Sequence, residues 1–288
     1  MKIKEKIGVI GIGNMGSAIL DGLFQKKMAS PSQVWVCDKI QEKAKDYAAT
    51  RKTKLASEAR AVFEKAEVIL LAVKPQDLKE LSVFSRGTAR RGPTSKMKKP
   101  VLISILAGTP IAKIKEILGS EVNLVRAMPN LGAKVGEAIT AITDETVVGA
   151  GSPRPLGAAT APLRLAQQIF SGCGKTVLLE EKYFDIVTAV SGSGPAYFFL
   201  LMELLSQAAV SQGMDPAIAK ELAVQTALGA GLLARNSEFA PAELRQQVTS
   251  KGGTTAAALD VFEEKGLREI VLKGIEAAIQ RGKDLSRG

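Results

Sequence analysis

A glycine-rich stretch near the N-terminus is the clearest place for chemistry in this sequence. Residues 11–16 read Gly-Ile-Gly-Asn-Met-Gly, between an apolar run over 6–10 and apolar residues at helical spacing over 17–24. At such a strand–helix junction, glycines permit a tight turn and a close approach to a pyrophosphate, which the helix N-terminus attracts. A plain tight turn is the alternative. The residues predicted to bind a dinucleotide here are Gly11, Gly13, Asn14, Met15 and Gly16.

An acidic residue ends the second predicted strand, which covers residues 34–37. Asp38 stands 22 residues after Gly16, where an acid in this kind of fold can hydrogen-bond the ribose hydroxyls of NAD. A solvated turn residue is the alternative interpretation. A 2′-phosphate would instead require a cation, and Lys39 and Lys43 are near in the sequence. The residues therefore leave NADH and NADPH both open.

Two later turns also follow predicted buried strands, over residues 67–73 and 101–105. Ligands of an open parallel sheet lie beyond the carboxyl ends of its strands, so these turns are expected to line the cofactor. Ordinary loop chemistry is the alternative, because glycine and proline mark turns in any fold. The residues concerned are Ala72, Val73, Lys74, Pro75, Ala107 and Gly108.

Two segments of the second half combine hydroxyls with glycines before predicted helices. Residues 191–195, Ser-Gly-Ser-Gly-Pro, precede a long apolar helix and suit either an anion or a simple helix cap. Residues 249–255, Thr-Ser-Lys-Gly-Gly-Thr-Thr, offer backbone donors, four hydroxyls and a cation. That combination is typical of a carboxylate-binding turn, with a plain Gly-Gly turn as the alternative.

The elements around these motifs predict two domains. The first half alternates apolar strands with helices, which favours a Rossmann-like α/β domain with a mostly parallel sheet covered on both faces. The part after Glu180 is almost entirely helical, with a strong helix start at Asp215-Pro216. We therefore expect a dinucleotide-binding domain over 1–180 and an all-helical domain over 181–288. The helices are too apolar for solvated surface, which predicts a compact domain or an interlocked dimer core.

Composition excludes several classes of site. The 288 residues include no histidine, which excludes a His-dependent triad and any histidine metal site, whereas hydride transfer from a bound cofactor needs neither. Cys37 and Cys173 show no disulfide or metal spacing, so we expect no metal and a cytoplasmic location. No apolar stretch approaches the roughly 20 residues of a membrane helix, so we expect no membrane partner.

The net charge of +10 could indicate nucleic acid or anionic substrates. Part of it is local, since the basic segment 86–99 carries six cations and no acid. No aromatic side chain interleaves these charges to stack on bases. We therefore interpret the segment as a solvated loop and expect no nucleic-acid partner.

Together the motifs resemble those of pyrroline-5-carboxylate reductases, nearly from end to end. The resemblance implies an enzyme that uses NADPH or NADH to reduce the C=N bond of 1-pyrroline-5-carboxylate to L-proline, the last step of proline biosynthesis. It also implies a Rossmann domain and a helical domain that interlocks as a homodimer, often assembled into decamers. The segments that carry the resemblance are 10–16, 72–76, 128–130, 191–197 and 248–255.

The resemblance also implies roles for single residues. Thr255 matches the threonine whose hydroxyl lies near the substrate nitrogen, and it is the expected catalytic residue. The sequence departs from the family pattern at Leu131, Gly132 and Lys251, and we expect Lys251 to add a charge near the substrate carboxylate. The further residues implied in substrate binding are Glu238, Ser250, Gly253, Thr254 and Ser191.

Other functions stay open at this point. One is a reductase of another cyclic imine, such as piperideine-2-carboxylate. Another is a hydroxy-acid dehydrogenase with the same two-domain plan, although Ser191-Gly192-Ser193 stands where its catalytic lysine is expected. A dinucleotide sensor without catalysis and a nucleic-acid binder are the alternatives from other classes.

Overall fold

The chain divides into two compact units. The computed structural model describes residues 2–82, 99–120, 122–147 and 159–287. The first unit consists of Met1–Gly192 with Ile279–Gly288, and the second of Ser193–Ala278. This division lies later in the chain than the expected boundary after residue 180, which stays a prediction. Residues 86–98 of the basic segment lie outside the described residues.

Within the described residues, the first unit is built around an eight-stranded sheet with the order β3-β2-β1-β4-β5-β6-β7-β8. Neighbouring strands are parallel except β6 and β7, which are antiparallel. The predicted Rossmann-like, mostly parallel sheet is therefore confirmed. The strands are β1 (Ile7–Ile10), β2 (Val34–Cys37), β3 (Lys54–Leu55), β4 (Val68–Leu71), β5 (Val101–Ser104), β6 (Asn123–Met128), β7 (Ala138–Thr143) and β8 (Gly174–Leu178).

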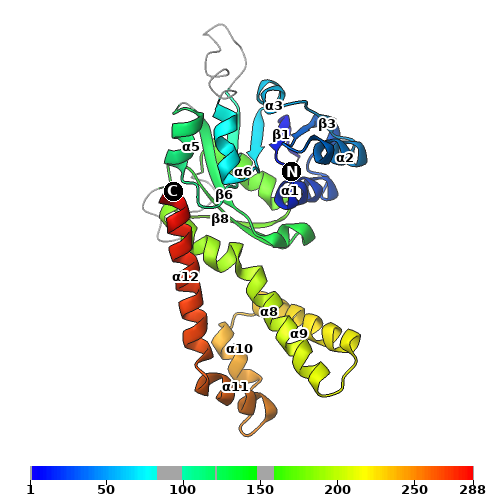
Figure 1. The fold of residues 1–288 in the computed structure, drawn as a ribbon, viewed down its shortest axis with the longest axis vertical. Helices are drawn as coiled ribbons and strands as arrows, with labels where there is room; N and C mark the ends of the chain where they lie inside the picture. Colours follow the sequence, from blue (N-terminus) through cyan, green and yellow to red (C-terminus); the bar gives the residue numbers. More distant parts are fainter. Residues whose placement is uncertain (1, 83–98, 121, 148–158, 288) are drawn as a thin grey trace. The chain divides into compact units, whose positions relative to one another are not determined.

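Helices cover both faces of this sheet (Figure 1). One apolar cluster packs α1 (Asn14–Gln25) and α6 (Ala161–Ser171) against it, and a second cluster includes α3 (Ala59–Lys65) and α5 (Ile111–Leu118). Neighbouring residues of β1 divide between the clusters, because successive side chains of a strand point to opposite faces. Strands that are apolar throughout are what such a two-sided sheet requires.

Further elements complete the first unit. Among them, η2 begins at Pro75, η3 begins at Leu131, and η6 ends with Ser191 and Gly192, all of which were singled out in the sequence. The remaining elements are η1 (Pro31–Gln33), α2 (Gln41–Arg51), η2 (Pro75–Leu81), η3 (Leu131–Val135), η5 (Glu181–Tyr183), α7 (Phe184–Val187) and η6 (Thr188–Gly192).

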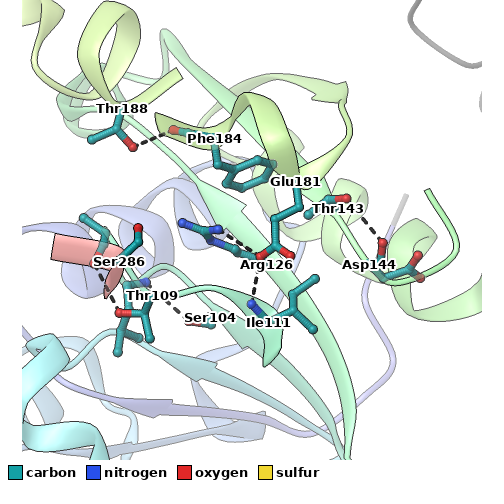
Figure 2. Close-up of polar contacts among 12 residues, drawn as sticks. Ser104, Thr109, Ile111, Arg126, Thr143, Asp144, Glu181, Phe184, Thr188 and Ser286 are labelled. Carbon is teal, nitrogen blue, oxygen red and sulfur yellow. Dashed lines mark hydrogen bonds and ion pairs between the residues drawn. The ribbon is translucent and has the colours of Figure 1, made fainter. Parts of the chain in front are cut away.

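A buried charge ties three parts of the first unit together (Figure 2). The side chain of Arg126, in β6, is only 4% exposed, and its Nη1 donates a hydrogen bond to Glu181 Oε1 at 2.9 Å. The same oxygen accepts the N–H of Ile111, at the start of α5, at 2.7 Å. The guanidinium also lies 4.7 Å from the ring centre of Phe184. Glu181 thus joins β6, α5 and the chain that leads into α7.

The second unit is entirely helical in its regular structure, as predicted. Helices α8 and α9 lie side by side as a hairpin (Figure 1). Asp215 begins α9 by accepting the N–H groups of Ala217 and Ile218 at 2.9 and 3.2 Å, which confirms the predicted cap. The helices are α8 (Gly194–Ser211), α9 (Pro216–Asn236), α10 (Pro241–Gln247), α11 (Thr254–Glu264) and α12 (Leu267–Arg287), whose last turns belong to the first unit.

Much of the apolar surface of this second unit is exposed in the single chain. In α8 only Gly194 is buried, while Phe198 is 64% and Leu200 53% exposed. Leu222 and Leu228 of α9 are half exposed as well. Large apolar side chains exposed in such number along neighbouring helices are typical of an interaction site on a protein.

Two helical stretches also reach the length and composition of membrane spans. They cover Glu181–Ser211 and Pro216–Asn236. The expectation that no stretch approaches this length was therefore wrong, because average hydropathy tolerates polar residues such as Glu203 and Gln207 among many Ala and Leu. One or two such helices are weak evidence for a membrane, since helices that pack against protein pass the same test.

The Arg126–Glu181 pair leads to a stability prediction. We expect Glu181→Ala to lower the free energy of unfolding by about 3 kcal/mol, because it leaves a buried guanidinium uncompensated. Glu64→Ala removes a pair with Arg60 in which both side chains are largely exposed, and should cost less than about 1 kcal/mol. Urea titrations followed by the fluorescence of Trp35, the single tryptophan, compare the two variants. Equal effects would contradict a structural role for Glu181.

Candidate active site

The three glycines of residues 11–16 differ in what surrounds them, and therefore in why a side chain would not be tolerated. Gly11 has φ +103°, and a Cβ there would lie 2.4 Å from the carbonyl oxygen of Ala72. A Cβ on Gly16 would lie 2.2 Å from the carbonyl oxygen of Gly11. A Cβ on Gly13, in contrast, would meet nothing within 4 Å. The fold itself requires Gly11 and Gly16, whereas Gly13 faces a space that a ligand can occupy.

The N-terminus of α1 beside this space suits an anion. Gly13 is its N-cap and no side chain caps the helix, so first-turn N–H groups point outward at the positive end of the helix dipole. Lys134, from η3, donates a hydrogen bond from Nζ to Asn14 Oδ1 at 3.3 Å. Sequence reasoning missed Lys134, because 120 residues separate it from Asn14.

Asp38 holds the glycine loop in place. Its Oδ2 accepts the N–H of Ile12 at 2.7 Å, and its Oδ1 accepts the N–H of Ile40 at 2.9 Å. The carboxylate therefore links the turn after β1 to the turn after β2. The ribose contact expected of Asp38 stays a prediction, and the structure adds this anchoring role.

A cavity of about 600 Å³ lies beside these turns, within the first unit. Its volume is in the usual range for small-molecule sites. Six of the predicted cofactor residues line it, namely Gly11, Gly13, Asp38, Ala72, Val73 and Lys74. The loop, the open helix end and the cavity together fit a dinucleotide.

The other predicted cofactor residues do not line this cavity. Gly108 is buried, and a Cβ there would lie 2.9 Å from Leu285 Cβ in the last turns of α12. A cofactor contact for these residues stays a prediction. They are Asn14, Met15, Gly16, Pro75, Ala107 and Gly108.

The cavity is also lined by acidic side chains that the glycine-rich motif of residues 11–16 did not predict. Lys39 Nζ lies 2.7 Å from Glu80 Oε1 and 3.2 Å from Asp77 Oδ1. Hydrogen bonds to Glu80 and Asp77 raise the pKa of Lys39. Burial raises the pKa of the Cys37 thiol, with further contributions from the negative charges of Asp38 and Glu58.

Two motifs that are far apart in the sequence meet in the first unit. Asn130 Nδ2 donates a hydrogen bond to Ser191 Oγ at 3.2 Å. A Cβ on Gly192 would lie 2.6 Å from Met128 Cε. Ser191 and Gly192 belong to a π-helical turn, a feature that is frequent at functional sites. Asn130, absent from the predicted site residues, is placed here by the contact with Ser191.

The turn before α11 leaves the first N–H groups of that helix without a side-chain cap. Gly252 has φ +69°, and the N–H of Gly253 donates to the carbonyl of Ser250 at 3.0 Å. Gly253 is the N-cap of α11 without a side-chain cap, so the N–H groups of Thr254 and Thr255 begin an open helix end. This geometry suits the predicted carboxylate site.

Glu238 is not joined to that turn by any polar contact within the described part of the chain. It is exposed, in the connection between α9 and α10. Its role with substrate stays a prediction.

The described residues also hold no group of three or more His, Cys, Asp or Glu that could bind a metal ion.

Comparison with known proteins gives two family matches. The model described as pyrroline-5-carboxylate reductase dimerisation matches residues 181–285, and that of NADP oxidoreductase, coenzyme F420-dependent, matches residues 6–108. The pyrroline-5-carboxylate reductase of Synechocystis sp. is 36% identical over 98% of both chains. That of Methanosarcina acetivorans is 34% identical, also over 98% of both.

The chain belongs to the pyrroline-5-carboxylate reductase family.

Solved structures of pyrroline-5-carboxylate reductases have the same fold. The enzyme of Coxiella burnetii matches with a TM-score of 0.85 and 32% identity over 99% of each chain. The enzyme of Plasmodium falciparum, solved with NADP bound, matches with a TM-score of 0.82 and 26% identity over 99% of this chain and 100% of that chain. The predicted combination of a Rossmann-like domain and a helical dimerisation domain is confirmed.

The open space at Gly13 leads to a binding prediction. We expect Gly13→Val to weaken NADPH and NADH binding at least tenfold, roughly 1.4 kcal/mol, because the side chain enters the space that a pyrophosphate needs. The thermal midpoint should stay close to wild type, since a Cβ at Gly13 meets no protein atom. Gly16→Ala, whose Cβ meets the Gly11 carbonyl, should lower that midpoint. Titration of nicotinamide fluorescence and thermal melts measure both, and undiminished affinity in Gly13→Val would refute the assignment.

Proposed function

We propose that this chain is a pyrroline-5-carboxylate reductase that reduces the ring C=N bond of 1-pyrroline-5-carboxylate to L-proline with NAD(P)H. This is the last step of proline biosynthesis. Relatives named for this activity cover 98% of the chain. The observation that carries the proposal is the open space at Gly13, beside an uncapped helix N-terminus and a 600 Å³ cavity.

The residues of the first unit would hold the cofactor. The turn at Gly13 and the start of α1 offer N–H donors to a pyrophosphate, and Lys134 adds a positive charge next to Asn14. Asp38 offers a carboxylate to a ribose hydroxyl. A bound nicotinamide cofactor supplies the hydride chemistry that the side chains lack.

The reaction suits a protein without histidine. The imine carbon accepts a hydride and the imine nitrogen carries a proton, so C=N becomes CH–NH. The ring nitrogen can take its proton from water before the step, and the chain then needs to orient the ring rather than supply a strong acid. We assign this orientation to the Thr255 hydroxyl, next to the open end of α11.

The substrate carboxylate would bind at the turn before α11. Ser250, Gly253 and Thr254 provide hydroxyls and backbone N–H groups there, and helix N-termini favour carboxylates. Ser191, fixed by Asn130, and Glu238 are further candidates for substrate contact.

We also propose that the helical region makes the chain a homodimer in the cytoplasm, with assembly to a decamer as a further step. The dimerisation model over 181–285 supports this, and it begins where we expect the second domain to begin. The exposed apolar side chains of α8 and α9 would then bury against a second copy instead of lipid. No membrane or nucleic-acid partner is part of the proposal.

Purified protein tests the reaction directly. Oxidation of NADPH and of NADH is followed by absorbance, with and without 1-pyrroline-5-carboxylate. Oxidation that depends on this substrate supports the proposal. Cofactor binding without oxidation would favour another cyclic imine, such as piperideine-2-carboxylate, or a sensor.

Thr255 gives a prediction about catalysis. We expect Thr255→Ala to lower kcat/KM for 1-pyrroline-5-carboxylate by about 10- to 1000-fold, the range for losing one positioned polar group. Thr255→Ser keeps the hydroxyl and should retain most of the activity. Steady-state kinetics with both variants separate the hydroxyl from the side-chain methyl, and wild-type rates in Thr255→Ala would rule out the assigned role.

Lys251 gives a prediction about substrate affinity. It is exposed in the turn before α11, so its ammonium can attract the substrate carboxylate. We expect Lys251→Ala to raise the substrate KM by about three- to tenfold with kcat little changed, as for the loss of uniform binding. The increase should shrink at high salt, which screens exposed charges. An unchanged KM at low salt would contradict the assignment.

A further inference from the structure

We infer that the cavity selects a dinucleotide without a 2′-phosphate, so that this chain binds NADH in preference to NADPH. Asp38, Asp77 and Glu80 are the residues that determine the choice. The inference concerns the cofactor of the proposed reductase and rests on the same binding site.

Asp38 occupies the position at which an acidic residue binds the adenosine ribose in this kind of fold. Two hydrogen bonds, from the N–H groups of Ile12 and Ile40, fix its carboxylate. An ionised carboxylate has about four acceptor positions, so it can still accept from ribose hydroxyls. A 2′-phosphate offers no donor in its dianionic form and would be repelled.

Lys39 is the cation that follows Asp38, and a 2′-phosphate could have used it. Its ammonium is held between Glu80 Oε1, at 2.7 Å, and Asp77 Oδ1, at 3.2 Å. Exposed ion pairs of this kind are individually weak, so they alone would not keep Lys39 from a ligand. A phosphate drawn to Lys39, however, would also come close to Asp77 and Glu80.

The charges that line the cavity have a negative sum. Asp38, Glu58, Asp77 and Glu80 give −4, and Lys39, Lys43 and Lys74 give +3, so the sum is −1. The whole chain has the opposite sign, with +10. Burial is the main cause of the raised pKa of Cys37, and the negative charges of Asp38 and Glu58 add to it.

Two features of α2 favour a phosphate near the ribose, and a negatively charged side chain opposes each of them. Lys43 lies in the first turn of α2, but Glu42 lies in that turn as well. The N-terminus of α2 also has no side-chain cap, but a phosphate there would lie next to the Asp38 carboxylate, which accepts the N–H of the N-cap residue Ile40. The balance at the ribose therefore favours hydroxyls over phosphate.

The experiment measures dissociation constants of NADH and NADPH by nicotinamide fluorescence, at low and high salt. In the wild type we expect NADH to bind about tenfold more tightly than NADPH, which is about 1.4 kcal/mol. Asp77→Asn/Glu80→Gln removes the two negative charges beside Lys39 and leaves the Asp38 anchor intact. It should tighten NADPH binding about tenfold, mostly at low salt, and change NADH binding less than about twofold.

The matched control is Glu64→Gln/Glu145→Gln, which makes the same change of net charge. These residues pair with Arg60 and Lys115 and do not line the cavity. The control should leave both dissociation constants unchanged. Tighter NADPH than NADH binding in the wild type overturns the inference, as does an equal NADPH gain in the control. Failure to bind either cofactor would instead count against the proposed function.

Discussion

The hydrogen bond from the Ile12 amide to the Asp38 carboxylate is the contact on which the cofactor side of this enzyme depends. The N–H of Gly11 donates to the carbonyl of Cys37 at 2.8 Å, and one residue later Ile12 reaches Asp38 at 2.7 Å. These bonds continue the pairing of β1 with β2 beyond the strands. The glycine loop is therefore held as an extension of the sheet, so its open N–H groups are preorganised for a ligand.

Strand order explains why one loop borders so many candidate groups. β1 lies between β2 and β4, so the turns after all three strands meet at one edge. Ala72, after β4, lies so close to Gly11 that no side chain fits between them. Any side chain at Gly11 would push these turns apart and change the shape of the cavity that they line. The chemistry of the cavity thus follows from sheet topology and from the glycine that lets the backbones approach.

Local patterns predicted what lies within a few residues of the chain, and tertiary contacts decided the rest. The spacing of residues 11–16 and the position of Asp38 predicted a dinucleotide site because strand, turn and helix follow one another directly in the sequence. The pairing of Lys39 with Asp77 and Glu80, and the contact of Lys134 with Asn14, join residues 38 to 120 positions apart. Nothing in a single sequence marks such partners. β3 was missed for a different reason, since it has two residues and both are exposed.

The apolar helices of the second unit show even more clearly that a sequence does not reveal which partner a side chain packs against. Composition indicated buried helices, yet in one chain the side chains of Phe198 and Leu228 remain half exposed or more. Apolar side chains of this size gain about 1.5 to 3 kcal/mol each when they are fully buried. A second copy of the chain can provide that burial while the polar ends of the helices, such as the Asp215 cap, stay in water. A bilayer would instead surround Glu203 and Gln207, midway along α8, and desolvating that carboxylate would oppose the apolar gain. The polar residues within these helices, rather than their average hydropathy, therefore favour a protein partner.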